Sequence, residues 1–319
     1  MITARIVVAT FALAASTAGA FDVQGHRGAR GLAPENTLAA FRRALEVGVT
    51  TIETDVGVTR DGVVVIAHDR RLNPALTRTA DGKWLTAPGP TIRSLSLADL
   101  SAYDVGRLDP SSSYAKTLPQ QVAVDGERIP TLEALIDLVK RSGRPVRINV
   151  ETKLSPNAPE DTLDPASFAR AVVETLRKAD FIDRTTLQSF DWRTLIEAKK
   201  LAPALRTACL TSEGGSGDTV KAGESGVSPW HAGLSLNANG GSVPALVKAA
   251  NCDIWSPFHR NVTPERLREA RALGLAVLPW TVNERADMEL LIDAGVDGII
   301  TDYPDRLLEA LRAKGKTPR

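Results

Sequence analysis

The sequence has little cysteine and almost no excess of charge, and each shortage excludes a class of protein. Only two of its 319 residues, Cys209 and Cys252, are cysteines, and two thiolates cannot build the cage of a cysteine-rich zinc site. The 39 basic residues nearly balance the 38 acidic ones. The chain therefore lacks the basic surface that binds a nucleic-acid backbone, and we expect no nucleic-acid partner.

Long apolar runs are also scarce, and the first one lies within residues 1–20. There Arg5 precedes a short apolar stretch, and Ala-Gly-Ala at positions 18–20 matches a cleavage site. This pattern predicts a secretory signal peptide. The alternative is an uncleaved anchor, but the run is shorter than the ~20 apolar residues that span a bilayer. We expect an exported protein, periplasmic or secreted, whose mature chain starts at Phe21 and does not insert stably into a membrane.

Export bears on the two cysteines. An exported chain can pair them in a disulfide, but the sequence does not place their Cα atoms within bonding reach. A disulfide and two buried small apolar side chains therefore remain alternatives at this stage.

Short β-branched runs alternate with amphipathic stretches, which is the pattern of repeated strand–helix units. Hydrophobic residues make up 43% and charged residues 24% of the chain, as in globular proteins. The predicted strands are Val23–His26, Thr51–Val56, Val63–His68, Val146–Thr152, Thr185–Ser189, Leu205–Leu210, Cys252–Ser256, Leu275–Thr281 and Gly298–Thr301. Eight strand–helix units close a TIM (β/α)8 barrel of roughly 250 residues. We predict this α/β fold for a single domain spanning 21–319.

The sequence predicts nine strands, one more than a TIM barrel needs, and a hairpin accounts for the extra one. Arg60-Asp61-Gly62 is a tight-turn signal between the second and third predicted strands, so these two form a hairpin. The stretch 70–127 is rich in Pro, Ser, Gly and Asp, and we predict that it is a segment inserted after the third strand. A second irregular stretch, 213–241, has a length that is typical of a functional or mobile loop. The sequence does not assign its role.

Residues at helix starts are also informative. Thr37 is expected to cap a helix over 38–47, with Gly48 just past its end. Asn283 is expected to cap a helix over 284–294 in the same way.

Charged residues interrupt two strands that should be apolar if both faces are buried. Glu53 and Asp55 are two apart, so on a strand they point to the same side. Glu151 and Lys153 repeat this spacing near the end of the fourth predicted strand. The carboxyl ends of the strands form the active-site mouth of a TIM barrel, so we expect these side chains to meet there.

The residue types point to phosphoryl chemistry. Glu53, Asp55 and Glu151 form an all-oxygen cluster that suits one hard divalent cation, Ca²⁺ or Mg²⁺, and the sequence does not choose between them. An ion-pair cluster that holds no metal is the alternative. Fixed positive charges suit a phosphate group, and histidines at strand ends can move protons near neutral pH. The chain has no Walker loop or Rossmann glycine fingerprint that would indicate a nucleotide cofactor. The positive charges are Arg27 and Lys153, and the histidines are His26 and His68.

Nine short motifs in order resemble the glycerophosphodiester phosphodiesterases and span about positions 24 to 308. They are His26-Arg27-Gly28, Pro34-Glu35-Asn36-Thr37, Glu53-Thr54-Asp55, His68-Asp69, Ile129-Pro130-Thr131-Leu132-Glu133, Glu151-Thr152-Lys153, Gln188-Ser189-Phe190, Trp280-Thr281-Val282-Asn283 and Thr301-Asp302-Tyr303-Pro304. Each motif alone is unspecific, whereas their order and spacing together are specific. The resemblance implies a TIM barrel with an insertion that borders the site.

The resemblance also implies an activity and a role for each matching residue. The implied reaction is metal-dependent hydrolysis of a small glycerophosphodiester to glycerol 3-phosphate and an alcohol. By resemblance His26 and His68 are the acid–base pair, and which of them is the base stays open. The cluster of three carboxylates holds the metal, and Arg27 and Lys153 hold the phosphate. Trp280 belongs to the substrate pocket. Glu35 and Asn36 either hold the loop and cap the helix or touch substrate.

Two other functions remain possible at this stage. One is a phospholipase-D-like enzyme of the same superfamily that acts on lysolipids or sphingolipids, with Trp230 and Phe258 lining an apolar part of the pocket. The other, from a different class, is a glycerophosphodiester-binding protein without catalysis. His231 and His259 lie outside the motifs, and we expect them at the surface or behind the site. The sequence leaves the preferred head group and the oligomeric state open.

Overall fold

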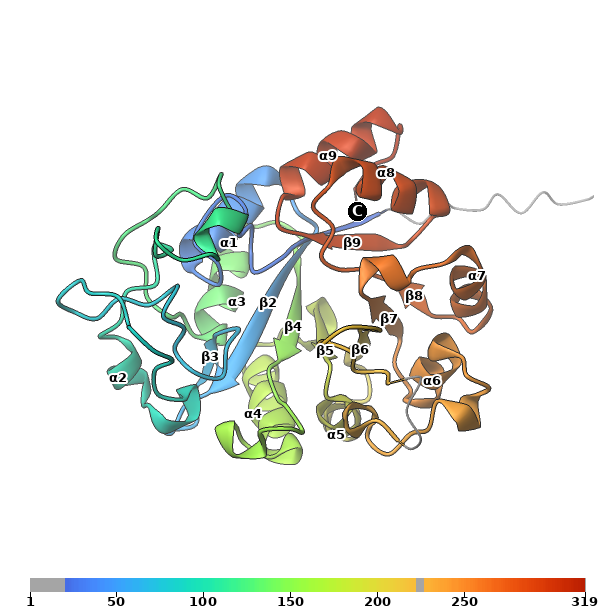
Figure 1. The fold of residues 1–319 in the computed structure, drawn as a ribbon, viewed down its shortest axis with the longest axis horizontal. Coiled ribbons are helices and arrows are strands. Elements are labelled where there is room, and N and C mark those ends of the chain that lie inside the picture. The colour runs from blue at the N-terminus through green and yellow to red at the C-terminus, as the bar shows by residue number, and fades with distance from the viewer. Residues whose placement is uncertain (1–20, 222–226, 319) are drawn as a thin grey trace, which may run out of the picture.

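Parallel strands surrounded by helices form a barrel in the computed structural model, which describes residues 21–221 and 227–318 (Figure 1). The predicted signal peptide lies outside the described residues. The strands are β1 (Asp22–Gly25), β2 (Thr51–Val58), β3 (Val64–Ile66), β4 (Arg147–Thr152), β5 (Thr185–Ser189), β6 (Arg206–Thr211), β7 (Ile254–Pro257), β8 (Ala276–Val277) and β9 (Gly298–Thr301). Each one overlaps a strand that the sequence predicts.

The sheet has the order β8-β7-β6-β5-β4-β2-β1-β9, and β3 pairs antiparallel with β2 alone. Hydrogen bonds next to the ladder close the circle between β8 and β9, because the Asp297 N–H donates to the Val277 carbonyl and the Ile300 N–H to the Pro279 carbonyl. The predicted TIM barrel is therefore confirmed as a nearly closed ring of eight parallel strands, and β3 is the outer arm of the predicted hairpin.

Helices cover the outside of the barrel. They are α1 (Leu38–Val47), α3 (Leu132–Arg141), α4 (Pro165–Lys178), α5 (Trp192–Leu201), α6 (Val243–Ala249), α7 (Pro264–Ala272), α8 (Arg285–Ala294) and α9 (Pro304–Ala313), with the short α2 (Leu97–Leu100) in the insertion. Their apolar faces and the outward side chains of the strands form one large core, which holds Phe41, Phe168 and Trp192.

Of the two helix caps that the sequence predicts, the one at Thr37 is present and the one at Asn283 is not. The Thr37 hydroxyl accepts from the Ala40 N–H at the start of α1, and Gly48 ends it in a left-handed conformation with φ 103°. The expectation for Asn283 is wrong, because α8 begins after Glu284 and its cap residue makes no side-chain bond. The Asn283 side chain instead binds Asp302, because its amide oxygen accepts from the Asp302 backbone N–H at 3.0 Å.

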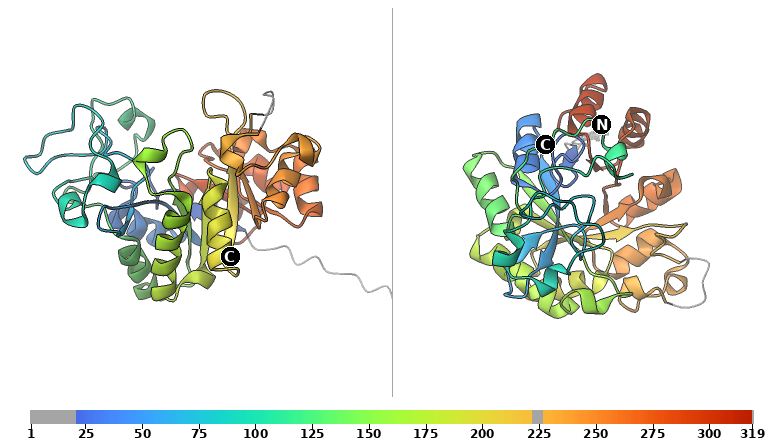
Figure 2. Two further views of the ribbon diagram at one scale, coloured as in Figure 1. Left: turned by 90° about the horizontal axis from the view of Figure 1, so that it is seen from below. Right: turned by 60° about the vertical axis from the view of Figure 1, so that its left-hand side comes forward.

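The insertion lies against one side of the barrel, opposite α6 and α7 (Figures 1 and 2). It has its own small apolar cluster, in which Leu72, Ile92 and Leu100 pack on Val65 of β3. Such a cluster gives the segment a fixed shape although it has little regular structure.

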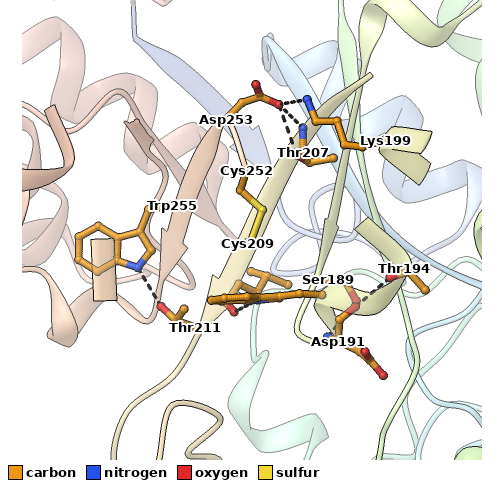
Figure 3. The surroundings of a disulfide bond; sticks show 12 residues. Ser189, Asp191, Thr194, Lys199, Thr207, Cys209, Thr211, Cys252, Asp253 and Trp255 are labelled. Carbon is orange, nitrogen blue, oxygen red and sulfur yellow. Dashed lines mark hydrogen bonds and ion pairs between the residues drawn. A yellow bond between two sulfur atoms is a disulfide. The ribbon is translucent and has the colours of Figure 1, made fainter. Parts of the chain in front are cut away.

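A disulfide joins Cys209 on β6 to Cys252, which lies just before β7, with the two Cα atoms 6.0 Å apart (Figure 3). Of the two alternatives for the cysteines, the bonded one is therefore present. A search of the described residues for a helix long and apolar enough to cross a membrane found none.

Candidate active site

Three carboxylates meet near the carboxyl ends of the adjacent strands β2 and β4. Glu53 and Asp55 extend from β2, and the parallel register places Asp55 beside Glu151 of β4. All three side chains are buried, and each offers an oxygen that lies within 4.8 Å of the others. The Gln188 amide donates to one Glu53 oxygen, and the Arg27 N–H donates to the other, both at 2.8 Å. The structure thus brings together the three residues that the sequence singles out as metal ligands.

The charge of this cluster fits a bound divalent cation. Burial raises the pKa of Glu53, and the neighbouring carboxylates of Asp55 and Glu151 raise it further. Burial and Asp55 also raise the pKa of Glu151, although Lys153 opposes them. Within the described residues, Asp55 Oδ1 is buried without a hydrogen-bond donor. Hard oxygen donors with unsatisfied negative charge are the ligands that Mg²⁺ and Ca²⁺ prefer.

Two cations balance only part of the negative charge. Lys153 Nζ lies 2.6 Å from Glu151 Oε1 and 3.6 Å from Asp55 Oδ1. Arg27 lies 3.4 Å from Asp55, but its Nη1 binds a fourth carboxylate, Glu35, at 2.6 Å. Four carboxylates, counting Glu53 of the cluster, thus face Arg27 and Lys153, while the third cation of the cavity, Arg30, is paired with Asp302. The formal excess of two negative charges equals the charge of one divalent ion. An ion-pair cluster alone leaves that excess buried, which is costly.

His26 directly follows β1 and is held by a carboxylate. Its Nδ1 lies 2.6 Å from Asp302 Oδ1, and its Nε2 lies 4.0 Å from Glu53 Oε2. Burial lowers the pKa of His26 to about 4, helped by the charge of Arg30 and opposed by Asp302. The neutral ring keeps its proton on Nδ1, where the carboxylate accepts it, so Nε2 is the nitrogen that can take up another proton.

His68 follows β3 and has a similar arrangement. Its Nδ1 lies 2.9 Å from Asp69 Oδ1, and the Asn73 amide donates to the other oxygen of Asp69 at 2.7 Å. Burial lowers the pKa of His68, and the charges of Arg27 and Lys153 lower it further. The ring is still 30% exposed. Both histidines therefore have Nδ1 fixed by an aspartate.

One cavity of about 210 Å³ connects these groups. Its polar lining consists of His26, Arg27, Arg30, Glu53, His68, Glu151, Lys153, Gln188 and Thr281. Two histidines, fixed positive charges and carboxylates that can hold a metal thus share one solvent-accessible space at the barrel mouth.

The cavity also has an apolar lining, which includes Phe190 and Trp280. Their rings meet edge to face with centroids 5.3 Å apart, and the indole N–H of Trp280 donates to the Ser256 carbonyl at 2.9 Å. Trp230 and Phe258 contact these two rings. Neither is among the described residues that line the cavity, so the apolar wall is narrower than the phospholipase-like alternative predicts.

Glu35 and Asn36 hold the site's own residues in place. Besides its bond to Arg27, the Glu35 carboxylate accepts from the Tyr114 hydroxyl. The Asn36 amide donates to Asp55 Oδ2 at 2.9 Å, and its oxygen accepts from the Thr54 hydroxyl. Thr37, not Asn36, caps α1. The expected helix-capping role for Asn36 is therefore wrong, because its side chain points to β2.

Sequence reasoning missed three residues of the site. Asp302 directly follows β9 and holds both His26 and Arg30, each at 2.6 Å from its Oδ1. Tyr114 comes from the insertion and lies 3.0 Å from an Arg30 nitrogen. The position of Asp302 at a strand end was a usable signal, because the same rule identified His26. Nothing in the sequence around Tyr114 or Arg30 indicated their places.

Comparison with known proteins agrees with this geometry. The model of the glycerophosphoryl diester phosphodiesterase family matches residues 26–306, nearly the whole described barrel. The chain belongs to this family. The resemblance stated from the motifs is therefore confirmed.

Individual relatives of the family align over almost the full chain. A glycerophosphodiester phosphodiesterase of Caldanaerobacter subterraneus is 30% identical, over 92% of this chain and 98% of its own. A solved glycerophosphoryl diester phosphodiesterase-family structure from Silicibacter pomeroyi is 35% identical with a TM-score of 0.82, covering 94% and 96% of the two chains. A phosphodiesterase of Oleispira antarctica, solved with its product sn-glycerol-3-phosphate, is 25% identical with a TM-score of 0.66, covering 91% and 96%.

Proposed function

We propose that this family member hydrolyses glycerophosphodiesters to glycerol 3-phosphate and an alcohol, with one divalent cation and two histidines. One observation carries the proposal: His26 and His68, each fixed through Nδ1 by an aspartate, face one cavity with a carboxylate cluster. The product complex of the Oleispira antarctica relative supports the choice of glycerol 3-phosphate as product.

The two histidines move the protons of the reaction. One imidazole accepts the proton of the attacking hydroxyl, from water or from the free glycerol hydroxyl next to the phosphate, as the new P–O bond forms. The other donates a proton to the leaving alcohol oxygen as its bond to phosphorus breaks. Attack by the glycerol hydroxyl gives a cyclic phosphate, which water opens by the same two transfers in the reverse direction.

The charged side chains bind and orient the diester. Arg27 and Lys153 supply positive charge for the non-bridging phosphate oxygens. Glu53, Asp55 and Glu151 would hold the divalent cation, which supplies further neutralisation of the phosphate charge when it is bound. Trp280 and Phe190, which line the same cavity, give the glycerol carbons an apolar surface.

We also propose that the protein works outside the cytoplasm. The predicted signal peptide at 1–20 is the basis of this proposal, and the Cys209–Cys252 disulfide supports it, since such bonds persist in oxidising compartments. Amino-terminal sequencing of the exported protein tests it. Phe21 at the amino terminus is the expected result. Protein that keeps residues 1–20 and stays in the cytoplasm contradicts the proposal.

The test of the activity is a product analysis on the purified chain. After treatment with EDTA, the protein is given glycerophosphocholine, glycerophosphoethanolamine, glycerophosphoglycerol or lysophosphatidylcholine, with Ca²⁺, Mg²⁺ or Mn²⁺ added back. We expect release of glycerol 3-phosphate from the small diesters only when a cation is present. Turnover of the lysolipid alone indicates the phospholipase-like alternative, and binding without turnover indicates a binding protein.

A further inference from the structure

A tyrosine of the insertion reaches the arginines of the active site. Tyr114 lies within the predicted insertion 70–127, just before the short helical turn Ala115–Thr117. Its hydroxyl donates to the Glu35 carboxylate and lies 3.0 Å from Nη1 of Arg30 and 3.5 Å from Nη1 of Arg27. A single hydroxyl thus contacts both arginines that line the catalytic cavity.

The direction of these hydrogen bonds follows from the chemistry of the groups. A guanidinium only donates and a carboxylate only accepts, so the tyrosine oxygen accepts from the arginines and its proton goes to Glu35. Burial raises the pKa of Tyr114, and the charge of Glu35 raises it further. The hydroxyl therefore keeps its proton and links the carboxylate to the two cations.

The segment around Tyr114 is fixed to the loop that carries the arginines. The Gln121 amide donates to the Arg30 carbonyl at 2.8 Å, and the Val122 N–H donates to the Leu32 carbonyl at 3.0 Å. These two contacts with backbone carbonyls of the arginine loop leave little freedom for the tyrosine to follow a displaced arginine. The insertion thereby sets where the guanidinium groups can lie.

The bonds of Arg30 show why this restraint matters for the site. Its Nε donates to Asp302 at 2.6 Å, so Tyr114 on Nη1 and Asp302 on Nε hold the guanidinium from two directions. Arg27 is shared in the same way between Glu35 and Asp55. Without the tyrosine hydroxyl, Glu35 loses a donor and Arg30 loses an acceptor in a largely buried place, and both side chains must rearrange.

We propose that Tyr114 is a positioning residue that holds Arg30 and Arg27 toward the substrate phosphate, so that substrate affinity depends on the insertion. This inference rests on the proposed function. Tyr114 itself does not touch the reacting atoms in this account. Its loss should therefore weaken binding of diester and product more than it slows the chemical step.

The test compares Tyr114→Phe with the parent in diester hydrolysis and in titration calorimetry with glycerol 3-phosphate. We expect KM and the product Kd to rise roughly 10-fold, the size of a lost hydrogen bond to a charged group, while kcat stays within about threefold. Tyr103→Phe is the matched control, because Tyr103 also lies in the insertion and its hydroxyl makes no hydrogen bond to another described residue. It should change neither constant.

A double-mutant cycle of Tyr114→Phe and Arg30→Gln measures the coupling between the two side chains, and it tests the proposal even if one of these variants loses stability. The two effects on the product Kd should be clearly less than additive, because both variants break the same contact. Additive effects, or constants for Tyr114→Phe within twofold of the parent, overturn the inference, as does a parent that binds no glycerol 3-phosphate. A parent that binds the product but hydrolyses no diester overturns the proposed function alone.

Discussion

Asp302 Oδ1 lies 2.6 Å from Nδ1 of His26, and the same oxygen accepts from Nε of Arg30 at 2.6 Å. One carboxylate thus orients a histidine ring and a guanidinium group. Because Asp302 fixes the tautomer and the ring orientation of His26, its loss should slow the chemical step.

We predict that Asp302→Asn lowers kcat roughly 10²-fold and changes the affinity for the divalent cation little. Steady-state kinetics on glycerophosphocholine measures the first quantity and calorimetry the second. Asn283→Ala is the comparison, because the Asn283 amide donates to the other oxygen of Asp302 at 2.7 Å and accepts from the Asp302 N–H at 3.0 Å, so the variant removes contacts of Asp302 other than the one with His26. A kcat for Asp302→Asn within threefold of the parent contradicts the assigned role.

The carboxylate cluster gives a second prediction, which concerns stability. In the presence of EDTA, Glu151→Gln should be at least as stable as the parent, because it removes one of the repelling buried charges. Saturating Ca²⁺ or Mg²⁺ should stabilise the parent, by about 2.7 kcal/mol at a concentration of 100 times Kd, and the variant much less. Thermal unfolding measures both effects. Glu160→Gln, a change at an exposed acid nearby, should behave as the parent, and equal metal shifts in all three proteins would argue against the site.

The disulfide gives a third prediction. It closes a segment with a sequence separation of 43 between β6 and the strand that pairs with it, β7 (Figure 3). Replacing both Cys209 and Cys252 by alanine should lower the free energy of unfolding by about 2–4 kcal/mol, because the unfolded chain loses a constraint. Urea unfolding with and without dithiothreitol measures this. The reductant should destabilise the parent and leave the alanine variant unchanged, and an unaffected parent contradicts the prediction.

His231 gives a prediction on pH. It is 1% exposed and stacks on Trp192 with ring centroids 4.3 Å apart, so a position at the surface is wrong. Burial lowers the pKa of His231 from 6.5 to about 4, and the charge of Asp218 only partly opposes this. Between these two values the unfolded chain binds more protons than the folded one. The stability that the neutral ring contributes is therefore complete above pH 6.5 and is lost as the pH falls toward 4.

The variant His231→Phe keeps an aromatic ring on Trp192 and removes the titration. On going from pH 7 to pH 5, the parent should lose about 1–2 kcal/mol more of its free energy of unfolding than the variant. Denaturant unfolding at both pH values measures the difference. Equal losses in the two proteins would show that His231 does not titrate in this way.

The fold was predictable because its pattern is local. Each strand is a short apolar run, and the hairpin has its own turn signal at Arg60-Asp61-Gly62, so all nine strands could be placed from the sequence. Glu53, Asp55 and Glu151 could be identified as candidate metal ligands because they are polar residues on strands that should be apolar. The parallel pairing of the strands brings them together.

The remaining part of the site depends on long-range contacts that no local pattern encodes. Tyr114 reaches Glu35 across 79 positions of the chain, within a segment with little regular structure. Asn283 looked like a helix cap because its neighbours fit one, but a carboxylate 19 positions away takes its side chain instead. In both cases a tertiary contact with a charged group decides the position, and a single sequence does not contain that information.

The central claim is that two histidines move the protons of a metal-assisted diester hydrolysis. Its most direct test is the rate of glycerol 3-phosphate release from glycerophosphocholine by the parent and by His26→Ala and His68→Ala, with a saturating divalent cation. His259→Ala is the control, because His259 lies outside the residues that line the cavity. We expect a parental rate for the control and a loss of at least ~10²-fold for each of the other two variants. Turnover near the parental rate in either His26→Ala or His68→Ala would contradict the claim.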